Sequence, residues 1–260
     1  MNLGDIPHTR ENSVRFFLSY LEKNKDLVLG KTIYDLSAGV GYIANQFYEA
    51  GGILKVYDLF PKQNKYPHLA CEKIDLQKDF PIADQQADFV ILSETFEHLP
   101  NQFHFFKEAA RILKPNGILI LTTPNPSSLR GRFSQFLMES EHYSYPLADE
   151  TNAYANWPGT TNKYFAKIFM SGILRTRLLA ALNGLTIKEI HKTPYSSTSF
   201  VLLLLFYPII YFFSRKNLKW QLKEFPENNA IYKNIFSIST SPKVLLSKHL
   251  VVEFSKISVS

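Results

Sequence analysis

The stretch "IYDLSAGVGYIANQFYEAGG", residues 33–52, decides the fold of this chain. It begins as a short apolar strand, passes through a loop of small residues, and continues as a helix that ends at paired glycines. Gly39 and Gly41 permit unusual backbone angles in the loop, and the start of the helix offers unpaired N–H groups. A strand, a glycine loop and a helix N-terminus in this order predict a site for a polar ligand.

Strands and helices alternate on both sides of this stretch. Residues 87–94 are apolar almost throughout, as expected of a strand that is covered on both faces. The expected strands are 31–38, 53–59, 68–76, 87–94, 118–124, 185–192 and 245–256, and the expected helices are 11–29, 41–50, 101–113 and 163–182. This alternation predicts an α/β domain with a parallel sheet and helices on both faces, and we expect the chain, residues 1–260, to be a single domain.

The regular pattern fails over residues 125–162, which are rich in aromatic residues, Asn and Pro. Loops of that length are usually functional or disordered, so we expect a lid or acceptor loop here. Its aromatic and histidine side chains either line an acceptor pocket or pack the loop itself. These side chains are His142, Tyr143, Tyr145, Tyr154 and Trp157.

Charge is unevenly distributed along the chain, whose net charge is +6. Residues 1–160 carry 15 Lys/Arg and 19 Asp/Glu, whereas residues 161–260 carry 14 and 4. The basic portion is apolar and Phe-rich, without a basic groove that has spaced stacking aromatics, so we expect no nucleic-acid partner. A single cysteine, Cys71, and the absence of an apolar signal-peptide core at the start of the sequence favour a cytoplasmic location.

An insertion over residues 195–240 contains the least usual segment, "SFVLLLLFYPIIYFFSRKNLKW", residues 199–220. Its uninterrupted apolar run, 200–213, is shorter than the roughly 20 residues of a spanning helix. Basic residues and a tryptophan follow at once: Arg215, Lys216, Lys219 and Trp220. Two interpretations stay open, a helix buried in the core and a segment in peripheral contact with a membrane, which would place the protein on the inner membrane face.

Two acids indicate which ligand the glycine loop holds. Asp58 ends the second strand 23 residues after Asp35, near the roughly 20-residue offset at which an acid meets ribose hydroxyls. The dinucleotide pattern GxGxxG is absent, because Tyr42, Ile43 and Ala44 follow Gly41. A carboxylate at Asp35 disfavours a pyrophosphate and favours a cation, such as a sulfonium that carries an amino-acid tail and a ribose.

"YDLSAGVGYIA" resembles motif I of the class I S-adenosylmethionine (SAM)-dependent methyltransferases, and "VYDLFP" looks like their second motif. "IDLQKDFPIADQQADFVILSETFEHLPN" and "ARILKPNGILILTTPN" are similar to the later motifs. The resemblance covers residues 31–124 closely and returns weakly at 184–192 and 246–257. It implies a Rossmann-like, seven-stranded, mostly parallel sheet with an antiparallel last strand and SAM as the cofactor, with the insertion before that last strand.

The resemblance also implies which residues bind the cofactor. Asp35 and the backbone of Gly39 and Gly41 would hold the methionine end, Asp58 the ribose, and Asp75 with Leu76 the adenine. The full expected set is Asp35, Ser37, Gly39, Gly41, Asp58, Asp75, Leu76 and Ser93. Two residues depart from the family pattern, since Ser37 and Asn116 stand where glycines are usual.

"SETFEHLP", after the fourth strand, holds the expected chemistry. His98 is available as a base near neutral pH, with Glu97 beside it, for an acceptor oxygen whose proton must be removed. If a helical turn begins here, Glu94, Glu97 and His98 face one way and form a divalent-metal site. The spacing E-x-x-E-H resembles ubiquinone-pathway O-methyltransferases, in which the corresponding residues bind a metal. In the alternative, Glu97 and His98 only cap the helix and touch the cofactor.

Three hypotheses about the function stay open, two of which differ in the acceptor. "TPNPSSLRGRF", after the fifth strand, resembles methyltransferases associated with cell-surface polysaccharides, which favours methyl transfer to an oxygen of a small or lipid-linked glycan. A quinone-type lipid acceptor is the competitor, supported by E-x-x-E-H. The third hypothesis, motivated by Ser37 and the apolar insertion, is a non-catalytic partner protein of the same fold at a membrane.

Overall fold

The computed structural model describes residues 11–140, 149–157 and 160–257. Its strands are β1 (Thr32–Asp35), β2 (Ile53–Asp58), β3 (Cys71–Lys73), β4 (Ala87–Ser93), β5 (Leu113–Pro124), β6 (Tyr154–Asn156), β7 (Lys163–Phe165), β8 (Leu185–Ile190) and β9 (His249–Lys256). Its helices are α1 (Glu11–Val28), α2 (Tyr42–Glu49), α3 (Gln102–Ile112), α4 (Leu129–Met138), α5 (Ile173–Ala181), α6 (Ser197–Glu224), α7 (Asn229–Thr240) and α8 (Pro242–Leu246). Short 3-10 turns include η4 (Phe96–His98).

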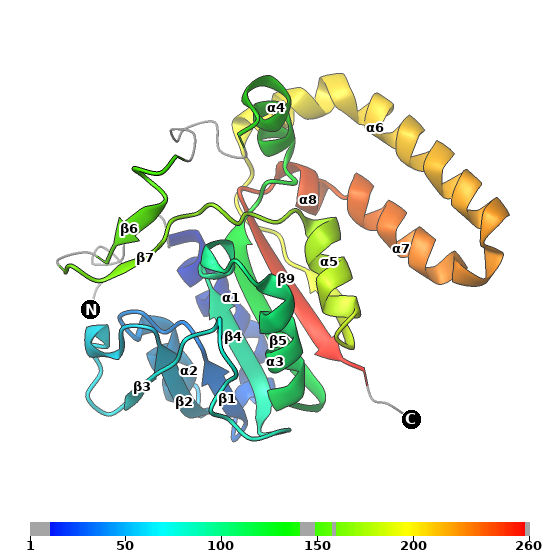
Figure 1. Ribbon diagram of the computed structural model, residues 1–260. Helices are drawn as coiled ribbons and strands as arrows, with labels where there is room; N and C mark the ends of the chain where they lie inside the picture. Colours follow the sequence, from blue (N-terminus) through cyan, green and yellow to red (C-terminus); the bar gives the residue numbers. More distant parts are fainter. Residues whose placement is uncertain (1–10, 141–148, 158–159, 258–260) are drawn as a thin grey trace.

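Seven strands form one twisted sheet in the order β3-β2-β1-β4-β5-β9-β8 (Figure 1). The pairs from β3 to β5 are parallel, and β9 runs antiparallel to both of its neighbours, β5 and β8. The predicted fold class, a mostly parallel sheet with an antiparallel last strand, is therefore confirmed. The order reverses at β1 and β4, and ligands of open α/β sheets bind beyond the carboxyl ends of strands at such a point.

Side chains of the central strands alternate between two buried layers. Tyr34, Val90 and Leu121 belong to the core layer that includes residues of α3 and α5. Ile33 and Ile91 belong to the opposite layer, where α1 and α2 pack. Both faces of the sheet are thus covered, which explains why these strands are apolar throughout.

Two expectations about the chain between β5 and β8 are wrong. The helix expected at 163–182 begins only at Ile173, after Gly172, and residues Lys163–Phe165 instead pair with β6 as strand β7. The segment expected to be irregular contains α4, whose N-cap Ser128 accepts a hydrogen bond from the Gly131 N–H at 3.1 Å. His142, Tyr143 and Tyr145 lie outside the described residues.

The insertion between β8 and β9 forms a pair of helices, α6 and α7, that extends beyond the sheet (Figure 1). Within α6, which the structure describes completely, Ser199 and Leu202 alone are buried. Leu202 packs on Leu129 of α4 and Leu245 of α8. The interpretation of residues 200–213 as a buried core helix is therefore wrong.

Candidate functional site

The loop between β1 and α2 depends on its glycines. Gly41 is the N-cap of α2 with φ +86°, and Gly39 has φ +55°. A Cβ on Gly41 would lie 2.2 Å from Oδ1 of Asn64. The backbone angle therefore favours glycine at position 41, and a Cβ there would also displace the Asn64 side chain.

Asp58 joins the end of β2 to this loop. Its Oδ2 accepts a hydrogen bond from the Gly39 N–H at 2.8 Å, and its Oδ1 accepts one from the Phe60 N–H at 2.8 Å. A carboxylate has about four acceptor positions, so two bonds leave room for hydroxyl groups of a ligand. This geometry suits the ribose-binding role expected for Asp58.

Serine fits at position 37, where the family pattern usually has glycine. It is not among the residues with positive φ, so a side chain brings no backbone strain there. Its N–H donates to Asp35 Oδ1 at 3.1 Å, and its hydroxyl accepts a hydrogen bond from the Ser93 N–H at 2.8 Å. Asn116 does take the left-handed conformation, with φ +62°, which asparagine adopts more readily than most residues.

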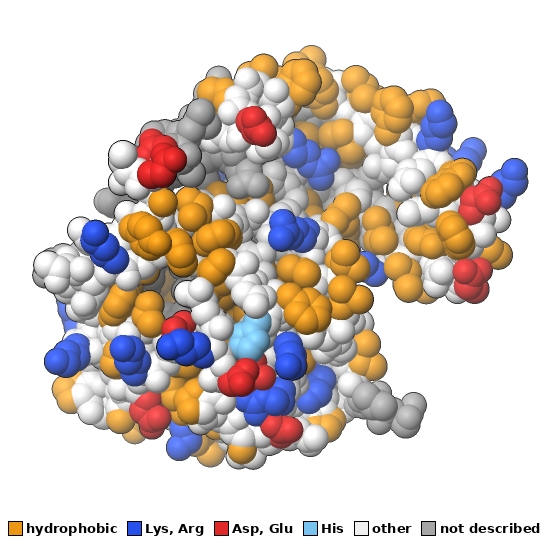
Figure 2. Space-filling model, viewed as in Figure 1, with side chains coloured by type: hydrophobic (Ala, Val, Ile, Leu, Met, Phe, Trp, Pro, Cys, Tyr) orange, Lys and Arg blue, Asp and Glu red, His pale blue; other side chains and the backbone are white. Residues whose placement is uncertain are grey.

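A cleft of about 210 Å³ lies beyond the carboxyl ends of β1, β2 and β4, where Figure 2 shows the molecule hollowed. The expected site residues that line it are Ser37, Asp58, Asp75, Leu76, Glu94 and His98. Asp35, Gly39, Gly41, Ser93 and Glu97 are not lining residues but lie in the loops and strand ends around the cleft.

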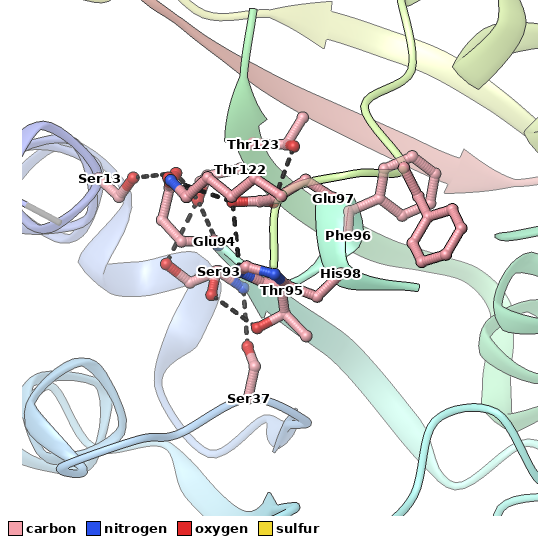
Figure 3. A network of polar contacts seen from close by, with 12 residues as sticks. Ser13, Ser37, Ser93, Glu94, Thr95, Phe96, Glu97, His98, Thr122 and Thr123 are labelled. Carbon is pink, nitrogen blue, oxygen red and sulfur yellow. Dashed lines mark hydrogen bonds and ion pairs between the residues drawn. The ribbon is translucent and has the colours of Figure 1, made fainter. Parts of the chain in front are cut away.

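Glu94 is held in a buried network that sequence reasoning missed (Figure 3). Its Oε1 accepts hydrogen bonds from the hydroxyls of Ser13, on α1, at 2.6 Å and Thr122, on β5, at 3.0 Å. Its Oε2 lies 3.5 Å from Nε2 of His249 and has no hydrogen-bond partner among the described residues. Three elements far apart in sequence therefore fix this carboxylate at the cleft.

Glu97 and His98 lie on η4 and differ in exposure. Glu97 is fully buried, and its Oε2 accepts a hydrogen bond from the Thr123 hydroxyl at 2.9 Å. Its Oε1 lies 3.8 Å from His98 Nε2 and 3.5 Å from Lys167 Nζ. His98 lines the cleft, and its ring stands edge-on to Tyr164 with centroids 5.1 Å apart. His98 can therefore reach a ligand, whereas the buried Glu97 contacts only protein groups around it.

The expected metal ligands Glu94, Glu97 and His98 do not share one face of a helix. Glu94 has φ +48°, and only a 3-10 turn follows it, because the chain bends sharply at the end of β4. Within the described residues, the acidic and histidine group whose ligand atoms converge is a different one, on β8 to β9: Glu189, His191 and Glu253. The predicted metal cluster is thus not formed in this structure.

The β6–β7 hairpin forms the outer wall of the cleft. Its lining residues are Tyr154, Trp157, Lys163, Tyr164 and Phe165. Trp157 lies 6.0 Å and Tyr164 lies 6.4 Å, between ring centroids, from Phe60 after β2. For Tyr154 and Trp157 the sequence left two alternatives open, lining a pocket or packing the loop, and both residues line the cleft, whereas Tyr164, Phe165 and Phe60 were missed.

The lining of the cleft fits a ligand with positive charge and hydroxyl groups. Asp58, Asp75 and Glu94 are acidic, and Lys163 is the one lysine or arginine among the described lining residues. Asp75 Oδ1 accepts a hydrogen bond from the Gln77 N–H at 3.1 Å, which leaves acceptor positions on its carboxylate. SAM carries a sulfonium, an amino group and ribose hydroxyls, so the residues present fit it.

Comparison with known proteins supports the same conclusion. Residues 34–121 match the protein family described as "Methyltransferase domain". The chain carries a class I SAM-dependent methyltransferase domain. The matched residues run from β1 to β5 and include the glycine loop, Asp58 and His98.

Two curated relatives and one solved structure illustrate the likeness. A ubiquinone biosynthesis O-methyltransferase of Idiomarina loihiensis is 30% identical over 46% of this chain and 52% of its own length. The enzyme of the same name from Xanthomonas oryzae pv. oryzae is 27% identical over 56% and 63%. The chain thus spans about half to two thirds of these relatives. A putative sarcosine dimethylglycine methyltransferase from Galdieria sulphuraria is 18% identical, with TM-score 0.52 over 97% of this chain and 89% of the other, which shows the shared fold.

Proposed function

We propose that this chain transfers the methyl group of SAM to an oxygen atom of an apolar, aromatic acceptor of the quinol type. One observation carries the proposal. The same cleft is lined by the acids expected to hold SAM, by His98, and by the aromatic wall of β6 and β7. Cofactor, base and acceptor surface therefore meet in one place, as a displacement in line requires.

His98 is the candidate base in this cleft. SAM, when bound, supplies a methyl group on a positively charged sulfur. An acceptor hydroxyl must lose its proton as it attacks, and an imidazole accepts that proton near neutral pH. Glu97, buried and 3.8 Å from His98 Nε2, is a positioning residue that orients the ring and stabilises the imidazolium.

The acceptor class follows from the wall facing the acids. Tyr154, Trp157, Tyr164 and Phe165 present rings to the cleft, and ring faces and edges favour a planar aromatic ligand. The curated relatives are named for O-methylation in ubiquinone biosynthesis, which agrees with an aromatic hydroxyl. The glycan acceptor stays a prediction from the sequence after β5. The proposal includes no metal, because the expected ligands do not converge.

The test separates an enzyme from a non-catalytic protein of the same fold. Purified protein is titrated calorimetrically with SAM and with its demethylated product, and methyl-labelled SAM is then supplied with a catechol-type quinol or with a glycan. We expect SAM binding, loss of binding in Asp58→Ala, and labelled quinol. In His98→Gln we expect unchanged SAM affinity and turnover lower by about 10²–10⁴-fold.

Each other outcome contradicts a stated part of the proposal. No SAM binding by the folded protein would favour the non-catalytic alternative. Labelled glycan without labelled quinol would show that the acceptor is a glycan and not a quinol. Unchanged turnover in His98→Gln would show that His98 is not the base. Asp79→Ala, a change on an exposed acid outside the lining of the cleft, is the control for Asp58→Ala and should bind SAM normally.

A further inference from the structure

The outward face of α6 is a large apolar surface that the fold leaves uncovered. The side chains of Leu204 and Leu205 are 70% and 65% exposed. The exposed apolar residues between positions 200 and 213 of the helix are Phe200, Val201, Leu204, Leu205, Phe206, Ile209, Tyr211, Phe212 and Phe213. Contiguous exposed apolar surface of this kind marks an interaction site.

The inward face of α6 is already occupied, so the outward face has no role in the core. Leu203, Tyr207 and Ile210 pack toward α4 and α8. Tyr211 stands edge-on to Phe236 of α7, with ring centroids 5.6 Å apart. Helix α7 thus covers one side of α6 and leaves the opposite side to the surroundings.

The end of α4 enlarges this surface. Phe136 is 83% exposed, and Leu137 and Met138 beside it are also exposed. Phe133 of α4 contacts Phe206 of α6, with ring centroids 6.3 Å apart, so the two helices adjoin. Figure 2 shows apolar side chains along the upper rim of the molecule, over α4 and the first half of α6.

Basic residues continue the same surface along α6. Its last ten residues carry Arg215, Lys216, Lys219 and Lys223 against one acid, Glu224. At 100° per residue, Lys216 and Lys219 lie on the same side of the helix as Leu205 and Phe212. Figure 2 shows this change from apolar to basic side chains along the helix. An apolar face with adjoining basic residues complements an anionic lipid surface.

We propose that α6, together with the end of α4, docks the protein on an anionic lipid bilayer. The helix lies in the interface and does not cross it. Helix α6 is long and apolar enough to span a membrane, but its apolar run of residues 200–213 would extend about 21 Å against a hydrocarbon core of about 30 Å. Insertion of α6 across the bilayer would also break its contacts with α7.

The position of the surface agrees with this role. Helix α4 follows β5 directly, so the surface lies at the carboxyl edge of the sheet, where the cleft also lies. Docking there would bring the cleft toward the bilayer. The proposal goes beyond methyl transfer and does not require it, because docking depends on α4 and α6 alone.

Flotation of the full chain with lipid vesicles tests the proposal. Vesicles of phosphatidylcholine alone are compared with vesicles that also contain phosphatidylglycerol, at low and high salt. We expect binding at least about tenfold stronger to the anionic vesicles, weakened by salt. Leu204→Glu/Leu205→Glu should abolish it. Leu182→Glu, at a residue 64% exposed after α5, should leave it unchanged.

A second variant tests the charges separately. Lys216→Gln/Lys219→Gln should lower binding to anionic vesicles about tenfold or more and reduce its salt dependence. Thermal unfolding establishes that each variant is folded. Undiminished binding by the Leu204/Leu205 variant, or equal loss in Leu182→Glu, would overturn the proposal. So would a vesicle-free dimer that the Leu204/Leu205 variant converts to monomer, because the surface would then belong to a second copy.

Discussion

The Ser37 hydroxyl accepts a hydrogen bond from the Ser93 N–H at 2.8 Å, across the loop ends of β1 and β4. Both residues are buried at the topological switch point of the sheet. A glycine at position 37 could not make this bond, so the departure from the family pattern adds an interaction and causes no strain. It therefore does not indicate a lost cofactor site.

We expect Ser37→Ala to destabilise the protein by about 1–3 kcal/mol, because the buried Ser93 N–H would lose its acceptor. Urea unfolding measures this change. Ser239→Ala is the matched control, since the Ser239 hydroxyl donates only to the Ile235 carbonyl within α7 and should cost less. Equal losses in the two variants would contradict the role assigned to Ser37.

A comparison of alanine substitutions at Gly30 and Gly41 separates the cost of backbone strain from the cost of steric overlap. Gly30→Ala should cost about 1–2 kcal/mol, because φ is +69° and the added Cβ meets nothing within 4 Å. Gly41→Ala should cost clearly more, because Asn64 Oδ1 lies 2.2 Å from the added Cβ. Both are measured by chemical unfolding. A Gly41→Ala cost no larger than that of Gly30→Ala would show that the Asn64 loop moves freely.

Glu108 makes the free energy of unfolding depend on pH in the acidic range. The Arg111 guanidinium, which donates to both carboxylate oxygens, holds the pKa of Glu108 below its ordinary value, and the Phe80 N–H contributes. A lowered folded-state pKa adds stability above the unfolded pKa of about 4.3, and this stability is lost as pH falls through the folded value.

Glu108→Gln should therefore lose about 1.5–3 kcal/mol at pH 7, and its difference from the wild type should shrink below about pH 4. Urea unfolding between neutral and acidic pH measures both quantities. Glu22→Gln, on the exposed face of α1, should show no such pH-dependent difference. A difference between wild type and Glu108→Gln that stays constant with pH would contradict the assignment.

The sheet could be predicted from the sequence because its strands are covered on both faces and therefore apolar without alternation. Ile33 and Tyr34 illustrate this, since they face opposite layers of the core. The β6–β7 hairpin could not be predicted, because Lys163–Phe165 reads equally well as the first turn of the apolar segment that becomes α5. Only pairing with Tyr154–Asn156 decides between them.

The candidate site, like the fold, could be predicted from the sequence only in part. Asp58 and His98 belong to local motifs, so their place at the cleft was predictable. The partners of Glu94 were not, because Ser13 and Thr122 are distant in sequence and carry no pattern of their own. The expected metal cluster does not form in this structure, because a single residue with positive φ, Glu94, breaks the helical spacing on which it depended.

Gln102 attaches the segment after β7 to the turn η4, which carries Glu97 and His98. Its Nε2 donates to the Phe96 carbonyl at 3.0 Å and to the Phe169 carbonyl at 2.6 Å, and its Oε1 accepts a hydrogen bond from the Ser171 hydroxyl. Phe169 N–H also donates to the Glu97 carbonyl at 3.1 Å. The segment that follows the outer wall of the cleft is therefore joined to η4 both by this buried amide and by the backbone bond of Phe169.

Gln102→Leu keeps the approximate size of the side chain but removes these bonds, so we expect a loss of about 1–3 kcal/mol. Amide hydrogen exchange of residues 163–171 should become faster than that of the central strands, because the segment opens locally. The acceptor KM should rise while SAM affinity stays unchanged. Gln46→Leu on α2, whose amide donates only to Glu49, is the control. Faster exchange across the whole sheet, with no preference for residues 163–171, would show that Gln102 supports the fold in general and not the wall of the cleft.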